Sequence, residues 1–253
     1  MFKEMLRPRR HVQGPQNDKK KPGFLVLAIF LLSFFAFFGF PAEAQNNLDP
    51  GSLSASVPTV SFELDWKVAD PQWYQITVDQ NGQATYESRP RAADNQPAGE
   101  PYNLHFIMSQ PTRTRIFQIA SALHDFQGNF ETRAKIAQTG KKTLTFRQGT
   151  KENKTTLNYS DNSEMNELIS LFQKMSTTFE TAQKLDYDMR FDKLGLDRDL
   201  KSLVQLDKDN QLAELQVIAP TLERIANDPS IMNIARQKAK QLLERSEPGG
   251  AQR

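Results

Sequence analysis

Cysteine is absent from this sequence of 253 residues. Its absence excludes disulfide bonds, thiolate nucleophiles, cysteine-ligated metal sites and lipid attachment through a cysteine. Histidine is scarce, with three residues in all, of which only His105 and His124 follow the first 44 residues. Two histidines without cysteine are a poor basis for a transition-metal site. The composition therefore predicts no metal ion or other cofactor.

A glycine-rich phosphate loop is also missing, because the 12 glycines are dispersed along the chain. Outside the N-terminal segment, the chain has no large excess of positive or negative charge. Residues 1–44 carry 7 of the 32 basic residues and 3 of the 30 acidic ones, which leaves 25 and 27 and a net charge of −2. Because nucleic-acid binding requires a basic surface, no nucleic-acid partner is predicted.

One long apolar run is present, at residues 24–40, and it contains no charged side chain. As a helix it would be about 26 Å long, slightly short of a hydrocarbon core of about 30 Å. The segment before it is rich in lysine and arginine, which directs the following part of the chain outward from the cytoplasm. We therefore predict an exported protein, periplasmic or extracellular.

The run ends in a pattern typical of a signal peptide. Gly39-Phe40-Pro41 breaks the helix, and Ala42-Glu43-Ala44 has the small-x-small form of a cleavage site. We expect cleavage between Ala44 and Gln45. The alternative is that residues 24–40 are retained and tether the protein to the inner membrane, with the C-terminal part outside. Membrane contact is expected only through this segment.

The remaining chain divides into a tether, a mixed domain and a helical region. Residues 45–58 are small and polar and read as a flexible tether. Residues 59–184 alternate between strand and helix periods in the order β-β-β-β-α-β-β-α. Residues 185–253 are all helix or loop. The predicted fold class is α+β, an antiparallel sheet with helices packed on one face, followed by an all-helical C-terminal region.

Turn and cap residues mark the boundaries of these elements. Asn81-Gly82 predicts a tight hairpin, and Gly149 a second one within residues 142–160. Asp161 and Glu164 have the spacing of a capping box, ahead of the best amphipathic helix. From 185 we expect a short helix that breaks near Gly195. Two further helices are expected at 211–226 and 229–246, with Asp228-Pro229 starting the second.

Two parts of the chain resemble known domains. The stretches "YQITVDQNGQATY", "LHDFQG" and "GKKTLTFRQG…TLNYSDNSEMNELISLF" carry the first resemblance. Through them, residues 59–184 resemble exported bacterial domains of unknown function with a β-β-α-β-β-α core. The stretch "LQVIAPTLERIANDPSIMNIARQKAKQLL", residues 215–243, resembles a single HEAT-type helical hairpin. Neither resemblance implies an activity or a set of site residues.

Few residues suggest catalysis. Glu63 and Asp65 share one face of a strand, as paired carboxylates of a hydrolase would, and His105 points outward from another strand. Because alternating strands place polar residues on a solvent face by default, we interpret all three as surface residues. Ser121, His124 and Asp125 are close in sequence but lie within one ordinary helix, which does not build a nucleophilic triad. No catalytic residue is therefore predicted.

Binding residues are similarly few. The acidic run from Asp186 to Asp199 departs from a calcium loop, with Phe191 where the turn requires glycine. Trp66, Trp73 and Tyr74 are interpreted as core residues, with a ligand platform as the alternative. In the last helix, an apolar band widens through three residues beyond what one partner helix covers, which makes them a candidate partner surface: Met232, Ala239 and Leu243.

The sequence thus favours an exported cell-envelope protein that binds or scaffolds another molecule without catalysis, with an envelope protein as a possible partner. One alternative is an envelope hydrolase using surface carboxylates or His105, beside the loop at 89–103. A further alternative is a periplasmic inhibitor or a chaperone-like factor. The oligomeric state cannot be derived from these patterns.

Overall fold

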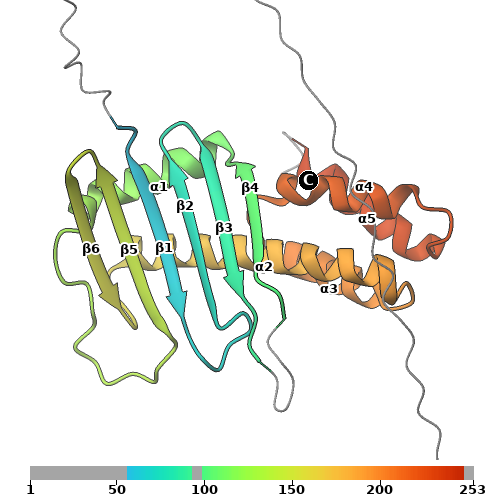
Figure 1. Ribbon diagram of the computed structural model, residues 1–253, viewed down its shortest axis with the longest axis horizontal. Helices are drawn as coiled ribbons and strands as arrows, with labels where there is room; N and C mark the ends of the chain where they lie inside the picture. The colour runs from blue at the N-terminus through green and yellow to red at the C-terminus, as the bar shows by residue number, and fades with distance from the viewer. Residues whose placement is uncertain (1–55, 93–98, 248–253) are drawn as a thin grey trace, which may run out of the picture. The chain divides into compact units, whose positions relative to one another are not determined.

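The computed structural model describes residues 56–92 and 99–247, and the leader with its Ala44–Gln45 cleavage site lies outside them. The described chain has an α+β fold, as predicted, with a six-stranded antiparallel sheet and five α-helices (Figure 1). None of the described helices is both long enough and apolar enough to span a membrane. The apolar run at 24–40 belongs to the part not described.

The first four strands of the chain are neighbours in the sheet, and the last two lie on the other side of the first strand. Its strands are β1 (Thr59–Asp65), β2 (Trp73–Asp79), β3 (Gln83–Arg89), β4 (Tyr102–Ile107), β5 (Lys141–Gln148) and β6 (Lys151–Leu157). Their order in the sheet is β4-β3-β2-β1-β5-β6, all antiparallel. The strands at β1 and β2 alternate between buried and half-buried positions, which leaves one apolar face for helices to cover.

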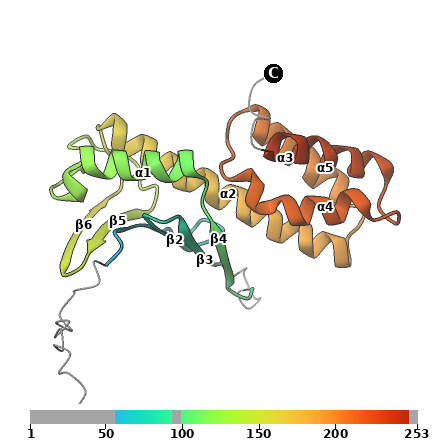
Figure 2. The same ribbon diagram turned by 90° about the horizontal axis from the view of Figure 1, so that it is seen from above.

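Two helices cover that face, α1 (Gln110–Ala122) and α2 (Ser163–Phe191), which lie on the same side of the sheet (Figure 2). Phe62 of β1 stacks on Phe172 of α2, with 5.2 Å between ring centroids. Tyr86 of β3 meets Phe179 of α2 edge to face at 5.2 Å. No described element covers the opposite face of the sheet. The core therefore lies between the sheet and the two helices.

Helix α1 ends at Ala122. It is followed by η1 (His124–Phe126), a turn whose three residues all have positive φ, between 52° and 64°. Positive φ is unusual for residues with a side chain. Burial of Phe126 helps to hold the turn, because its side chain has no exposed surface. His124 is exposed here, and it lies with Asp125 in this turn instead of within the predicted helix.

Helix α2 corrects two predictions. Its N-cap is Asn162, whose side chain accepts from the backbone N–H of Met165 at 2.9 Å. Asp161, the predicted cap, instead accepts from the Thr132 hydroxyl at 2.6 Å. The helix then runs across residue 185 to Phe191, so the separate short helix expected there is the end of α2. The break near Gly195 is confirmed, since the next helix begins at Leu196.

The C-terminal region contains α3 (Leu196–Lys208), η2 (Leu215–Ile218), α4 (Ala219–Asn227) and α5 (Asn233–Ser246). The helix predicted from 211 starts only at Leu215, because Glu214 has a left-handed conformation with φ 58°. Asp228 ends α4 instead of starting α5, and its carboxylate accepts from the N–H of Ser230 at 2.8 Å. This local turn delays α5 to Asn233.

Candidate functional site

Two neighbouring cavities lie where the β1–β2 loop and the start of β5 approach α2. Their volumes are about 340 and 430 Å³. Trp66 and Gln173 line both of them, so the cavities flank the indole of Trp66. We call this region the Trp66 groove. It is the strongest candidate for a ligand site because it combines an aromatic side chain with several polar groups from separate elements.

One wall of the groove is a stripe of α2. Asn166, Gln173, Thr177 and Thr181 contribute to it at helical spacing. Fifteen residue steps at 1.5 Å each give the stripe a length of about 22 Å. Thr177 and Thr181 donate their hydroxyls to helix carbonyls four residues earlier, at 3.0 and 2.7 Å. The groove is therefore long, and polar side chains line most of this side, with Glu180 as the charged residue among them.

Trp66 is held in place by a glycine. Gly140 has φ 93°, and a Cβ at this position would lie only 2.7 Å from the Cβ of Trp66. The two chains can approach this closely only because residue 140 has no side chain. Trp66 itself is half-buried, and its indole N–H has no hydrogen-bond partner among the described residues. The position of the Trp66 ring is thus fixed, and its indole N–H is available to donate a hydrogen bond to a ligand.

One end of the groove contains a buried cation, Lys142, whose exposed fraction is 5%. Its Nζ donates to the backbone oxygens of Thr139, Gly140 and Asn158 at 3.2, 3.3 and 2.7 Å, and contacts the Thr139 hydroxyl at 3.0 Å. Burial lowers the pKa of Lys142, and the charge of Glu131 acts in the opposite direction. The ammonium ties the loop before β5 to the end of β6.

The other end contains a carboxylate, Glu180. It accepts a hydrogen bond of 2.6 Å from the hydroxyl of Tyr86, which is also 2.9 Å from the Ser176 hydroxyl. Burial raises the pKa of Tyr86, and the charge of Glu180 raises it further. The pKa of Tyr102 rises to about 12, first through burial and then through the charges of Asp186 and Glu180. Both tyrosines therefore stay protonated, and Tyr86 serves as a donor to Glu180.

The chain matches none of the known protein-family models and none of the curated proteins with which it was compared. The geometry of the groove is therefore the basis for assigning its chemistry. An aromatic ring, the free side-chain amide of Gln173 and several hydroxyls suit non-covalent binding. The Thr139 hydroxyl lies 3.0 Å from the Lys142 Nζ in this groove, but that Nζ also donates to three backbone oxygens, as a structural ammonium does.

The carboxylates considered for catalysis lie elsewhere. Glu63 and Asp65 are half-buried residues of β1, on the face of the sheet opposite α2. Asp65 pairs with Lys67 at 3.1 Å. His105 is exposed on β4, three strand spacings of about 4.8 Å from β1. The structure therefore does not bring His105 together with the two carboxylates.

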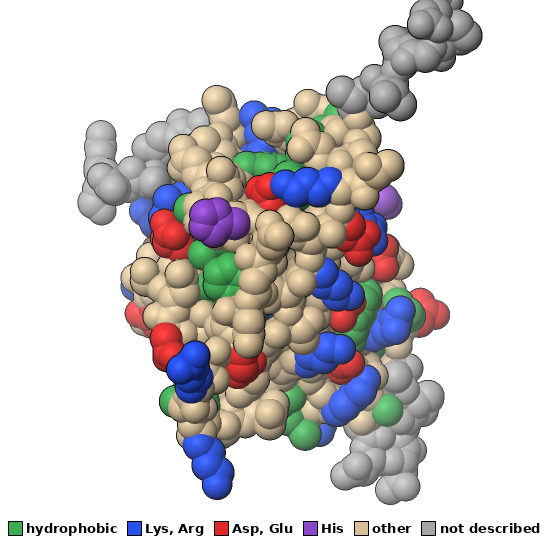
Figure 3. All heavy atoms as spheres, turned by 90° about the vertical axis from the view of Figure 1, so that its left-hand side faces the viewer, with side chains coloured by type: hydrophobic (Ala, Val, Ile, Leu, Met, Phe, Trp, Pro, Cys, Tyr) green, Lys and Arg blue, Asp and Glu red, His purple; other side chains and the backbone are tan. Residues whose placement is uncertain are grey.

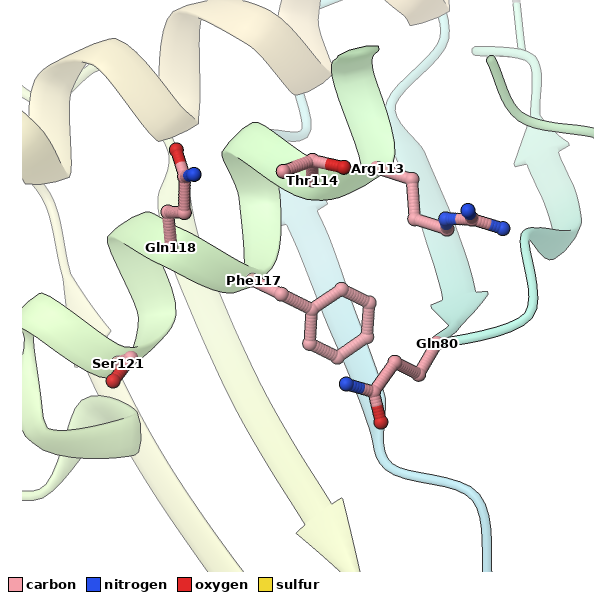
Figure 4. Close-up of a pocket in the computed structure, with 6 residues that line it drawn as sticks. All are labelled: Gln80, Arg113, Thr114, Phe117, Gln118 and Ser121. Carbon is pink, nitrogen blue, oxygen red and sulfur yellow. The ribbon is translucent and has the colours of Figure 1, made fainter. Parts of the chain in front are cut away.

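Ser121, His124 and Asp125 do not converge either. No hydrogen bond among the described residues joins them, and Asp125 instead pairs with Lys151 at 2.6 Å. Ser121 lines a larger cavity, of about 550 Å³, between α1 and Gln80, which follows β2. Figure 4 shows Phe117 of α1 and Gln80 pointing toward each other there, while Gln118 points away from them. The lining is mostly polar, but five of its six residues come from α1 alone.

The three residues of the candidate partner surface differ in how exposed they are. Met232 is 41% exposed, but Ala239 is fully buried and Leu243 is half-buried against the core. The reason is that α5 packs on both α3 and α4, so that two helices cover the wide apolar band. The exposed aromatic residues of this region lie instead near the end of α2, where the rings of Tyr187 and Phe191 are 4.8 Å apart.

The acidic run serves as part of a helix–helix contact. Lys184 of α2 pairs with Asp188 at 2.9 Å and with Asp199 of α3. Within the described ranges, no group of three potential metal ligands is found. At the β6 end of the sheet, basic and acidic side chains are intermingled on the surface (Figure 3). One contact there joins Arg147 to Glu152 at 2.6 Å.

Proposed function

We propose that this chain is an exported, non-catalytic binding module of the cell envelope and that the Trp66 groove is its ligand site. The leader at 1–44 supports export, as argued from its sequence. The observation that supports binding most strongly is the pair of cavities that flank one fixed tryptophan beside unpaired polar groups. Hydrolysis is the weaker candidate, since Glu63 and His105 belong to distant strands.

A cross-linking experiment tests this function. The chain has no cysteine, so the variant Ala69→Cys carries a single thiol beside the groove for a benzophenone-maleimide photo-cross-linker and leaves Trp66 and Gln173 unchanged. Gln237→Cys is the matched control, because it is an exposed glutamine on α5, outside the groove. The labelled proteins are mixed with an envelope extract of the host and irradiated.

We expect one defined adduct from position 69, reduced when unlabelled wild-type protein is added in excess, and no such adduct from position 237. Equal labelling from both positions would contradict a specific site. Absence of an adduct at position 69, although the label there is shown to be photoreactive, would also contradict the proposal. A Trp66→Ala change in the Ala69→Cys background should abolish the adduct, because the aromatic contact is removed.

A further inference from the structure

The charges of the Trp66 groove are already satisfied within the protein. Lys142 donates to backbone carbonyl oxygens, and Glu180 accepts from Tyr86. Asp70 lies exposed at the rim, where it accepts from the N–H of Arg91 at 2.9 Å. An ionic ligand would need a free countercharge inside the site, because burial of an unpaired charge is costly. The groove therefore favours an uncharged ligand.

The unpaired polar groups of the groove include both donors and acceptors. Among the described residues, the side-chain amide of Gln173 and the indole N–H of Trp66 have no partner. The hydroxyls of Thr177 and Thr181 donate to the helix backbone and keep their lone pairs free to accept. A ligand that satisfies this mixture needs several groups that both donate and accept. Hydroxyl groups have this property.

Flat apolar surface accompanies these polar groups. Trp66 stands between the two cavities, and Tyr159, which is 43% exposed, lines the one that contains Lys142. Sugar rings present apolar C–H faces that pack on aromatic rings, while their hydroxyls project sideways to hydrogen-bonding groups. The stripe of about 22 Å along α2 is long enough for several such rings in a row.

A peptide ligand fits the groove less well. Extended peptides commonly bind by adding a strand to a free sheet edge. The nearest strands, β1 and β5, are interior and pair on both sides. An amphipathic helix would need a continuous apolar groove, but Asn166, Gln173 and Thr177 interrupt this one. Recognition through side chains alone suits a glycan better.

We propose that the Trp66 groove binds a linear, uncharged polysaccharide segment. This inference rests on the binding function proposed above and specifies its ligand class. Trp66 supplies the stacking surface, and Gln173 the central hydrogen-bonding amide. Lys142 and Glu180 act as positioning residues that fix the two ends of the groove.

Tryptophan fluorescence gives a direct test, because Trp66 and Trp73 are the only tryptophans. In a Trp73→Phe variant, the emission reports on Trp66 alone. This protein is titrated with linear hexasaccharides of glucose, N-acetylglucosamine and mannose, and with an uncharged hexapeptide of serine, glycine and glutamine. We expect a saturable emission shift with at least one hexasaccharide and none with the peptide.

Two further variants link the shift to the groove. Gln173→Ala keeps the reporter and should weaken binding of the same hexasaccharide at least tenfold. Gln237→Ala, outside the groove, should leave its affinity unchanged. Equal affinities in both variants would place the sugar elsewhere and overturn the proposal.

The two proposals fail in different ways. A shift with the peptide only would overturn the glycan assignment. So would the absence of a shift with every hexasaccharide while the cross-link at position 69 still forms, and the binding site would then stand. Failure of both experiments would overturn both proposals.

Discussion

The hydroxyl of Tyr86 joins the sheet to α2 at a point where the side chain has no exposed surface. It meets both Ser176 and Glu180 of that helix. A buried hydrogen bond of this kind contributes little while it is made, but its loss leaves a polar partner unsatisfied. Glu180 is the partner at risk, because it is half-buried and also forms one end of the Trp66 groove.

Replacing Tyr86 by Phe should therefore lower the free energy of unfolding by about 1–3 kcal/mol, because Glu180 loses its donor. Urea denaturation followed by circular dichroism measures this change. Tyr187→Phe is the control, since Tyr187 is 59% exposed, and it should change stability by less than about 0.5 kcal/mol. Equal effects of the two changes would show that the Tyr86 hydroxyl does not stabilise the fold.

At the residue scale, some of the site was present in the sequence pattern. Lys142 precedes Leu144 and Phe146 at two-residue spacing, so strand alternation alone places it on the buried face. Trp66 was considered as a platform, although its role as core was preferred. Gln173 could not be recognised in advance, because it is exposed like most polar residues of an amphipathic helix. Gln173 lines the groove only because the β1–β2 loop approaches α2, and the path of this loop could not be predicted from the sequence pattern.

Helix α2 connects the sheet layer to the C-terminal helices. Ion pairs hold its C-terminal part in place. Lys184 contacts both Asp188 and Asp199, which links α2 to α3. Burial works against ionisation of Asp199, but hydrogen bonds from Arg198, Asp188 and Lys184 outweigh it and hold its pKa well below the usual range. Burial and the neighbouring Asp199 raise the pKa of Asp188, against the effect of Lys184.

The lowered pKa of Asp199 predicts a pH-dependent stability. A carboxyl group with a folded-state pKa below its unfolded value of about 3.9 stabilises the fold above that pH, and the effect is lost as the pH falls. Wild type should be more stable than Asp199→Asn by about 1–2 kcal/mol at pH 6, allowing for the half-exposed Lys184.

The difference between the two proteins should decrease as the pH falls from about 4 towards 2. Denaturant unfolding at pH 6, 4, 3 and 2 measures it, and Asp209→Asn, at the exposed end of α3, serves as control. A difference that stays constant with pH would show that the charge of Asp199 does not stabilise the contact.

Element lengths were the weakest part of the sequence prediction. All six strands were anticipated, because alternation and the turns at Gly82 and Gly149 are local signals. The end of α2 was not, since residues 185–191 mix charged and aromatic side chains without a clear stripe. The buried Asp188 on this turn becomes explicable only when Asp199 of α3 joins it around Lys184, from farther along the chain.

At the scale of the whole described molecule, the sheet layer and the C-terminal helices are joined by buried polar contacts. Glu214, before η2, accepts from the N–H and hydroxyl of Ser109, before α1, at 2.8 and 2.7 Å. The N–H of Ala213 donates to the Thr178 hydroxyl of α2 at 3.2 Å. These contacts between distant parts of the chain predict that the two layers unfold together.

Leu222→Asp tests this coupling, because Leu222 is fully buried in α4 and a charge there has no partner. We expect the melting temperature to fall by about 10 °C or more. Both tryptophans lie beside β1 and β2, so fluorescence reports on the sheet layer, whereas far-UV circular dichroism reports mainly on the helices. The two probes should shift together, and an unchanged fluorescence transition would show that the helical region unfolds separately.

The central claim is that the Trp66 groove is occupied in the envelope. Oxidative footprinting with mass spectrometry measures it, by comparing hydroxyl-radical labelling of Trp66 in the purified protein and in the native envelope fraction. Trp73, which lies half-buried on the other face of the sheet beneath the Arg89 guanidinium at 4.3 Å, is the internal reference. We predict that labelling of Trp66 relative to Trp73 falls severalfold in the envelope. Equal ratios in the two samples would contradict the account.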